Sequence, residues 1–176
     1  ALNKLKLVNP LLDVADSNKP LLAICLGMQL LMKESYEFGQ HCGLGIIDGP
    51  VVHLGDSIDA KVNAKPKFKI PKVGWNRIFY PTYGEGPSDM KSMLSDRWSG
   101  TPLDGIPDGS YMYFVHSYYP KPFDPEVLLS VSDYEGLIFC SSLASNNIFG
   151  CQFHPERSGT LGLKVYENFA RSAGGS

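Results

Sequence analysis

The spacing of the apolar residues changes at Cys25. Residues 20–24 form an unbroken apolar run, which is typical of a fully buried strand. From Leu26 the apolar residues recur at helical spacing as far as Glu34, which lies with Lys33 on the exposed side. The pattern therefore predicts a buried strand, a sharp turn at Cys25 and a helix that runs through Glu34.

The rest of the chain reads as short elements joined by loops. A helix over about 9–15, capped by Asn9 with Pro10 in its first turn, precedes the buried strand. Apolar runs predict strands over 111–119, 127–132, 137–142 and 148–153. A turn at Asn146-Asn147 joins the last two strands, and a final helix spans 161–170.

The middle of the chain is less regular. Residues 45–54 read as two short strands broken at Asp48-Gly-Pro50, and residues 61–72 suit an exposed antiparallel ribbon. Residues 81–107 are rich in Gly, Pro, Ser and Asp. They predict a long loop with one helical turn near 91–98.

Composition narrows the function classes. A chain of 176 residues is most simply one domain, and a net charge of −2 argues against nucleic acid as the main partner. No apolar stretch approaches the roughly 18 residues of a membrane span, and no signal-peptide pattern is present. The cysteines lack paired or metal-type spacing, so we expect free thiols, no metal and a cytoplasmic location; they are Cys25, Cys42, Cys140 and Cys151.

Cys25 is the candidate nucleophile. A nucleophile at a sharp strand-to-helix turn is lifted out of its sheet, and small residues at Ala23 and Gly27 let strand and helix approach. The same turn places the sulfur at a helix N-terminus, which favours the thiolate. We therefore expect Cys25 to be the one cysteine used in chemistry. A buried core cysteine is the alternative interpretation.

A second candidate follows the last strand, at Gln152-Phe-His-Pro-Glu156. A cysteine nucleophile needs a base, and the base needs a group that orients it. His154 at the end of a strand suits the first role, and Glu156 suits the second because it can hold the other ring nitrogen. Taken alone, the tripeptide is better explained as a surface turn, and its value comes from its combination with Cys25.

Together these motifs resemble a known family. Ile24-Cys-Leu-Gly-Met-Gln29 and Phe153-His-Pro-Glu156 are similar to class I (triad) glutamine amidotransferases. Val73-Gly-Trp-Asn76 and Tyr113-Phe-Val-His-Ser-Tyr118, with Ser158-Gly159 after the triad, resemble the glutaminase subunit of imidazole glycerol phosphate synthase. The resemblance implies a single α/β domain over 1–176, with a mainly parallel central sheet, flanking helices and an antiparallel flap.

The resemblance also implies residue roles. Cys25 would attack the side-chain amide of glutamine, with His154 as acid and base and Glu156 orienting it. The implied glutamine-binding residues, of which Leu26 would donate its N–H to the oxyanion and Glu37 would face the α-amino group, are Leu26, Gln29, Glu37, Ser117 and Tyr118. No cofactor is implied. In the alternative interpretation Gln29 and Glu37 are ordinary surface residues, and Ser117 and Tyr118 belong to a core strand.

The sequence departs from the family pattern in three places. Family members begin with a strand, a helix, a second strand and a Pro-Gly loop that supplies the other oxyanion donor. This chain lacks them, so we expect a fragment or, as the alternative, a divergent protein with half an oxyanion hole, and in either case a chain without full glutaminase activity. Residues 83–100 look like a loop insertion. Lys72 stands where a histidine is common, on the face that would dock the partner together with Trp75 and Asn76.

The expected function is glutamine hydrolysis, with the ammonia passed to a (β/α)₈-barrel synthase subunit in histidine biosynthesis. The alternatives are the glutaminase subunit of a sugar-modifying amidotransferase in surface-polysaccharide synthesis, a non-catalytic module that keeps the fold, and a cysteine peptidase. An assay of free glutamine against peptides separates the peptidase from the others.

Overall fold

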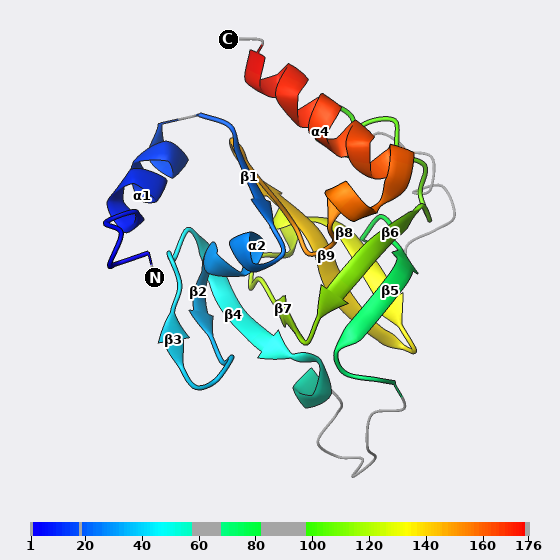
Figure 1. Cartoon of the computed structure of the whole chain (residues 1–176), viewed down its shortest axis with the longest axis horizontal. Coiled ribbons are helices and arrows are strands. Elements are labelled where there is room, and N and C mark those ends of the chain that lie inside the picture. The colour runs from blue at the N-terminus through cyan, green and yellow to red at the C-terminus, as the bar shows by residue number, and fades with distance from the viewer. Residues whose placement is uncertain (1, 18, 58–67, 82–97, 175–176) are drawn as a thin grey trace.

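The described part of the chain contains three small sheets with helices around them (Figure 1). The computed structural model describes residues 2–17, 19–57, 68–81 and 98–174. The first sheet has the strand order β1-β10-β9-β8, with bounds Leu21–Ile24, Ile148–Cys151, Leu137–Ser145 and Leu128–Tyr134. The second has the order β3-β2-β4-β7, with bounds His41–Cys42, Met32–Ser35, Ile47–His53 and Tyr118–Pro120. The third pairs β5 (Lys72–Arg77) with β6 (Tyr111–His116).

The described strands pair in both directions. β1 lies parallel to β10, and β2 lies parallel to β4. The other described ladders, β2 with β3, β4 with β7, β5 with β6, and β9 with both β8 and β10, are antiparallel. The α/β class is therefore confirmed, but within the described residues the sheets are mixed rather than mainly parallel.

The helices lie around the sheets (Figure 1). α1 (Val8–Asp16) precedes β1, α2 (Leu26–Leu30) follows it, and α4 (Gly159–Gly174) ends the described chain. Short 3₁₀ turns, at η1, η3 and η4, cover Leu54–Ser57, Pro125–Val127 and Pro155–Arg157. α1 begins at Val8 with Leu7 at its N-cap, not at the predicted Asn9 cap. No helix in the described ranges is both long and apolar enough to cross a membrane.

Two apolar clusters hold the sheets together. The smaller one gathers around α2, where Met28 and Met32 are fully buried with Leu143 of β9 and Ile148 of β10. It therefore joins the first sheet to the second beneath the turn at Cys25. The larger cluster, built on side chains such as Phe114, Phe139 and Phe153, lies between the third sheet, the first sheet and α4.

The helix after Cys25 is shorter than predicted. α2 ends at Leu30, and the residues expected to continue it form β2. Met32 is buried and Lys33 exposed, a contrast that suits a strand as well as a helix over so short a window. β2 pairs with β3 on one side and β4 on the other, so the sheet supplies its backbone partners. Tertiary pairing decides the conformation here.

The predicted break at Asp48-Gly-Pro50 is also wrong, because β4 runs through it. Gly49 has a φ of 129°, and a Cβ at this position would lie 2.5 Å from the Lys121 carbonyl oxygen. Glycine is thus required for the close passage of residues 121–123. The Pro50 carbonyl still accepts a hydrogen bond from the Lys121 N–H at 2.8 Å. Pro50 therefore takes part in the sheet despite lacking its own N–H.

The strand-rich second half is confirmed. β8, β9 and β10 correspond to the three predicted strands, and Asn146 takes the expected positive φ of 51° between β9 and β10. The run over 111–119 forms β6 and β7, which part at Ser117. Most of the predicted ribbon over 61–72, the helical turn near 91–98 and most of the insertion over 83–100 lie outside the described residues.

Candidate active site

Cys25 occupies a strained turn between β1 and α2. Its backbone has φ 51° and ψ −106°, a conformation that costs a non-glycine residue of order 1–3 kcal/mol. The Cys25 N–H donates to the Cys151 carbonyl oxygen at 2.7 Å, which ties the turn to β10. A Cβ on Gly27 would lie 3.6 Å from the Ala23 Cβ, an ordinary van der Waals contact, so strand and helix pack directly against each other here. The predicted elbow is confirmed.

The parallel pairing of β1 with β10 brings the two sequence motifs together. Ile24 lies opposite Cys151, so both strands end at the same edge of the sheet. Cys25 continues one strand, and the segment 152–156 continues the other. The Gln152 Nε2 lies 3.5 Å from the Cys25 Sγ, which shows that the second motif reaches the candidate nucleophile.

The candidate base is held at one nitrogen and free at the other. His154 Nδ1 lies 2.7 Å from Glu156 Oε1. His154 Nε2 is buried and has no hydrogen-bond partner among the described residues. When Nδ1 carries the proton and donates a hydrogen bond to Glu156, Nε2 presents a lone pair. That tautomer is the one a general base requires.

Glu156 is itself fixed from several sides. Partial burial raises the pKa of its carboxyl, but hydrogen bonds from its own N–H, His154 and Tyr166 and the charge of His154 outweigh burial and lower that pKa. The Tyr166 hydroxyl on α4 donates to Glu156 Oε2 at 3.4 Å. Glu156 is therefore an anion at neutral pH and an acceptor for His154.

The environment of the Cys25 sulfur differs from the sequence expectation. Burial is the largest influence and raises the pKa of the thiol, and the nearby charges of Glu156 and Glu37 raise it further. Hydrogen bonds from the Leu26 N–H and the Gln152 amide act in the opposite direction but do not outweigh burial. The helix N-terminus is expected to favour the thiolate, but burial outweighs it. Cys25 therefore needs a base to remove its proton.

A pocket of about 590 Å³ opens beside the turn. One wall is α2 and the other is the segment around β3, and the lining residues are Leu26, Gln29, Leu30, Ser35, Glu37, Phe38, His41, Cys42 and Gly43. Three of the five predicted glutamine-binding residues, Leu26, Gln29 and Glu37, thus share one pocket. Its size and its mixed polar and apolar lining suit a small zwitterion.

The other two predicted residues lie behind this wall. Ser117 and Tyr118 do not line the pocket. The Tyr118 carbonyl oxygen instead accepts a hydrogen bond from Gln29 Nε2 at 2.9 Å, and the Ser117 carbonyl accepts one from the Leu54 N–H. Gln29 is buried rather than a solvated helix residue, with 8% of its surface exposed.

Comparison with known proteins identifies the family. A family model described as glutamine amidotransferase class-I matches residues 5–173. This chain belongs to that family. Within it, the chain is 38% identical to imidazole glycerol phosphate synthase subunit HisH 1 of Legionella pneumophila (strain Lens), over 96% of this chain and 72% of that protein.

Further relatives support the same assignment. The HisH subunit of Aquifex aeolicus (strain VF5) is 39% identical, over 98% of this chain and 70% of that protein. A solved glutamine amidotransferase superposes with a TM-score of 0.54 over 92% of this chain and 65% of that one, at 13% identity, which shows the fold alone. The predicted resemblance to class I glutamine amidotransferases is thus confirmed.

The predicted docking residues of this amidotransferase domain separate into two groups. Lys72 is buried, with its Nζ 4.4 Å from the centroid of the Tyr134 ring, and burial lowers its pKa. It therefore faces the interior and not a partner, because the alternation of β5 turns it away from the outer face. Trp75, with 53% of its surface exposed, lies on that outer face, so the core-tryptophan interpretation is excluded.

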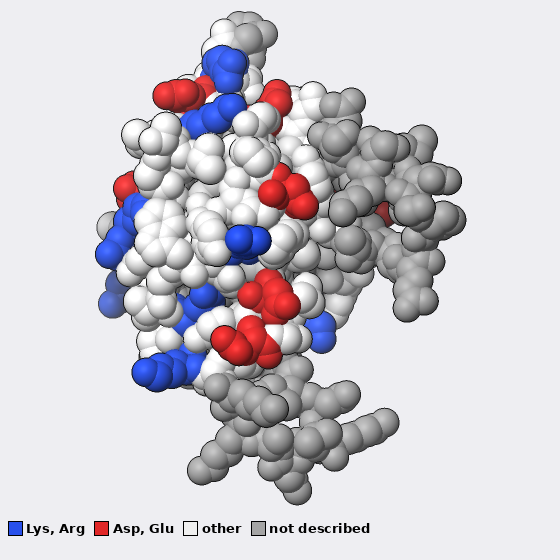
Figure 2. Space-filling view, turned by 90° about the vertical axis from the view of Figure 1, so that its right-hand side faces the viewer, with Lys and Arg blue, Asp and Glu red and all other residues white. Residues whose placement is uncertain are grey.

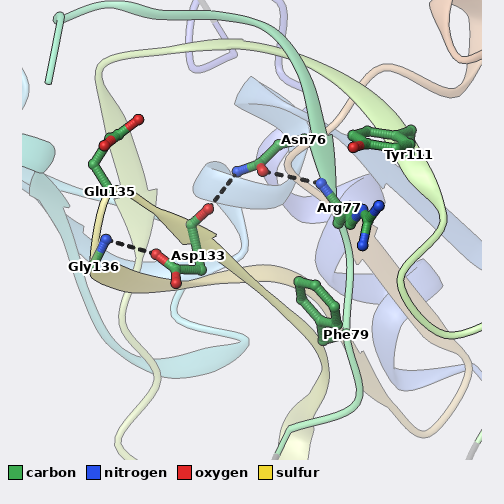
Figure 3. A pocket seen from close by; sticks show the side chains of 7 residues that line it. All are labelled: Asn76, Arg77, Phe79, Tyr111, Asp133, Glu135 and Gly136. Carbon is green, nitrogen blue, oxygen red and sulfur yellow. Dashed lines mark hydrogen bonds between the residues drawn. The ribbon is translucent and has the colours of Figure 1, made fainter.

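Asn76 lies at the rim of a second, shallow hollow (Figure 3). Its Nδ2 donates to the Asp133 carbonyl oxygen at 2.9 Å, and its Oδ1 accepts from the Arg77 N–H at 3.0 Å. Both ends of the Asn76 amide are thus used within the domain. Asn76 holds β5 against the end of β8, and its neighbour Trp75 is the freer side chain.

Sequence reasoning missed one side chain that contacts Cys25 and a pair of side chains that lies beside the triad. Gln152 belongs to a motif that was recognised, but its own role was not. Tyr113 and Arg157 lie together beside the triad, with the Arg157 guanidinium 4.3 Å from the Tyr113 ring centroid. Arg157 directly follows Glu156 in sequence. Its contact with Tyr113 arises because η4 packs against β6, and no local sequence pattern shows that packing.

Proposed function

We propose that this domain is the glutaminase subunit of imidazole glycerol phosphate synthase and acts in the cytoplasm. It hydrolyses glutamine to glutamate and ammonia and passes the ammonia to a (β/α)₈-barrel synthase subunit. The observation that carries the proposal is that the Cys25 turn and the hydrogen-bonded His154–Glu156 pair follow two adjacent parallel strands at one sheet edge. The HisH relatives support the pathway.

The chemistry follows from the geometry. His154 Nε2 takes the thiol proton, and the Cys25 sulfur attacks the side-chain amide carbon of glutamine. The tetrahedral intermediate collapses to a thioester as His154 returns the proton to the departing ammonia. Water, activated by the same imidazole, then hydrolyses the thioester to glutamate and frees the thiol. Glu156 holds the imidazole in the required tautomer and balances its positive charge.

The direct test of the proposed function is a coupled assay. Glutamate release from glutamine is measured with and without the barrel subunit and its sugar-phosphate substrate, and asparagine serves as the control substrate. In the full-length protein we expect release from glutamine alone, and faster release when the barrel subunit is present. Hydrolysis of a peptide in preference to glutamine would overturn the proposal.

Glu37 is the proposed ligand of the substrate α-amino group. Its carboxylate lines the pocket and is close enough to Cys25 to raise the pKa of the thiol. Glu37→Gln removes the charge with little change of volume. KM for glutamine is expected to rise by a factor equivalent to about 2–3 kcal/mol of binding free energy, the loss of one charge-assisted hydrogen bond, with kcat little changed. Steady-state kinetics measure this.

A matched control for Glu37 is Glu126→Gln. Glu126 is an exposed carboxylate in η3 and does not line the pocket. The Glu126→Gln substitution removes the same charge from a part of the surface outside the pocket, so KM for glutamine should stay at the wild-type value. An unchanged KM in Glu37→Gln would assign Glu37 to the surface and leave the α-amino group to another residue.

The outer face of β5 and β6 is the proposed docking surface for the barrel subunit. Cross-strand pairing places Val73, Trp75, Arg77, Tyr111, Tyr113 and Val115 on this one face. Val73, Trp75 and Tyr111 each expose more than half of their surface. In Figure 2 the side of the molecule that carries β5 and β6 faces the viewer, and it is mostly uncharged with both signs of charge interspersed. This composition suits an interface with a neutral, partly aromatic centre.

Trp75→Ala tests this surface. Trp75 meets Tyr113 edge to face, with ring centroids 5.9 Å apart, and has no other described ring contact. The domain should therefore stay folded. The binding free energy for the barrel subunit should weaken by about 2 kcal/mol or more, as for a central interface tryptophan, and ammonia transfer should become uncoupled from glutamine hydrolysis. Titration calorimetry and the ratio of synthase to glutaminase turnover measure the two effects.

Phe123→Ala is the control for Trp75. Phe123 is also an aromatic residue, with 67% of its surface exposed, but it lies beyond β7 and outside β5 and β6. Its removal should leave the Kd unchanged. An equal loss of affinity in both variants would contradict a docking surface on β5 and β6, and unfolding of Trp75→Ala would make that residue structural.

A further inference from the structure

Gln152 is a fully buried amide between two parts of the site. It exposes 0% of its surface, and its side chain extends from the end of β10 toward α2. Its Nε2 lies 3.5 Å from the Cys25 Sγ, and its Oε1 lies 3.1 Å from the Gln29 Nε2. The triad chemistry described above does not use this side chain.

The hydrogen bonds fix the orientation of both amides. The Tyr118 carbonyl oxygen can only accept, so the Gln29 atom 2.9 Å from it must be the nitrogen. The second hydrogen of that nitrogen is then directed at Gln152, whose facing atom must be the oxygen. The Gln152 nitrogen is left pointing at the Cys25 sulfur. A backbone carbonyl therefore determines, through two side chains, that the sulfur faces an N–H donor.

We propose that Gln152 is a further catalytic residue that donates a hydrogen bond to the Cys25 thiolate, and that Gln29 is a positioning residue that holds Gln152 in the donating orientation. The proposal rests on the proposed function because it takes Cys25 as the nucleophile. It also gives Gln29 a second task beside lining the glutamine pocket.

The sulfur needs such a donor. It is partly buried, and the ionisable groups that act on it are Glu156 from η4, Glu37 from the pocket wall and Cys151 from β10, beside His154, its base in the proposed mechanism. Both carboxylates disfavour a negative sulfur. Leu26 N–H and the Gln152 amide are the described donors that favour it. A neutral amide stabilises the thiolate without adding a positive charge that would repel the protonated His154.

The experiment measures the thiol pKa of Cys25 directly. The rate of iodoacetamide alkylation of the Cys25 peptide is followed against pH by mass spectrometry, which separates it from the exposed Cys42. Gln152→Met keeps the length of the side chain and removes the donor. We expect the alkylation pKa to rise by about one unit, which is a tenfold loss of thiolate at any pH below the pKa.

Two further variants separate a donor from a space-filling role. Gln152→Glu keeps the shape and an acceptor for Gln29 but replaces the N–H with a carboxylate, so the pKa should rise at least as far as in Gln152→Met. Gln40→Met makes the same exchange at an exposed glutamine that hydrogen-bonds to Glu34, and should leave the pKa unchanged. Gln29→Met should raise the pKa by less than Gln152→Met.

The outcomes are distinct. An unchanged Cys25 pKa in folded Gln152→Met overturns the proposal, and if that variant does not fold, an unchanged or lower pKa in Gln152→Glu overturns it. The alkylation readout does not depend on glutaminase activity. Full glutaminase activity in Cys25→Ala would instead reject the proposed function, and the hydrogen bond from Gln152 to the Cys25 sulfur would still be tested by alkylation.

Discussion

Cys25→Ala is expected to abolish glutamine hydrolysis. The thioester route needs a sulfur at the turn between β1 and α2, and losing the nucleophile of a triad lowers kcat by about 10⁴-fold or more. The fold should survive, because the hydrogen bond from residue 25 to Cys151 uses the backbone N–H. Glutamate release is the measurement, and circular dichroism checks the fold.

Two controls make the Cys25 result specific. Cys140→Ala removes a buried thiol in β9, so it should cost stability while the folded enzyme keeps its activity. The barrel subunit supplied with ammonium salts should work equally well beside Cys25→Ala. Loss of activity in folded Cys140→Ala would contradict the assignment of Cys25 as the cysteine used in chemistry.

His154→Gln is expected to lower kcat by about 10³- to 10⁴-fold, the range for loss of a general acid and base. Glutamine fills a similar volume but cannot carry the thiol proton, and the pKa of Cys25 is raised by burial, so little thiolate forms without a base. KM for glutamine should change little, because His154 does not line the pocket. Steady-state kinetics separate the two parameters.

His116 is the matched competitor for this role. Its Nε2 is also buried without a partner among the described atoms, but burial lowers its pKa to about 4. It is therefore neutral near pH 7 and a weak base. His116→Gln should keep kcat within about tenfold, a far smaller loss than a general base shows. If instead His116→Gln were the inactive variant and His154→Gln active, the base would have to be reassigned.

Much of the site could be predicted because its signals are local. The change of apolar spacing at Cys25, with Ala23 and Gly27 beside it, is enough to predict the turn. His154 and Glu156 stand two positions apart, so their contact needs no knowledge of the fold. The pocket residues Leu26, Gln29 and Glu37 are instead implied by the family resemblance, and they follow Cys25 within a short stretch of chain.

What could not be predicted depends on contacts between distant segments. The 32–35 segment is a strand because β3 and β4 lie beside it. Lys72 turns inward because of the alternation of β5, and a lysine before an exposed valine looks like a surface residue from sequence alone. The pKa of Cys25 is raised by burial that only the assembled sheets create. Gln152 acquires its orientation from a carbonyl that is distant in sequence.

The adjacency of β1 and β10 has a consequence for how this protein can vary. Cys25 and His154 are held in position by two neighbouring strands, not by the long path that connects them. Segments between residues 31 and 147 can therefore gain or lose length at the surface without moving one catalytic group relative to the other. We therefore expect surface insertions to preserve the Cys25–His154 geometry where they spare that strand pairing, the residues of the pocket wall around β3 and the Tyr118 carbonyl that orients Gln29.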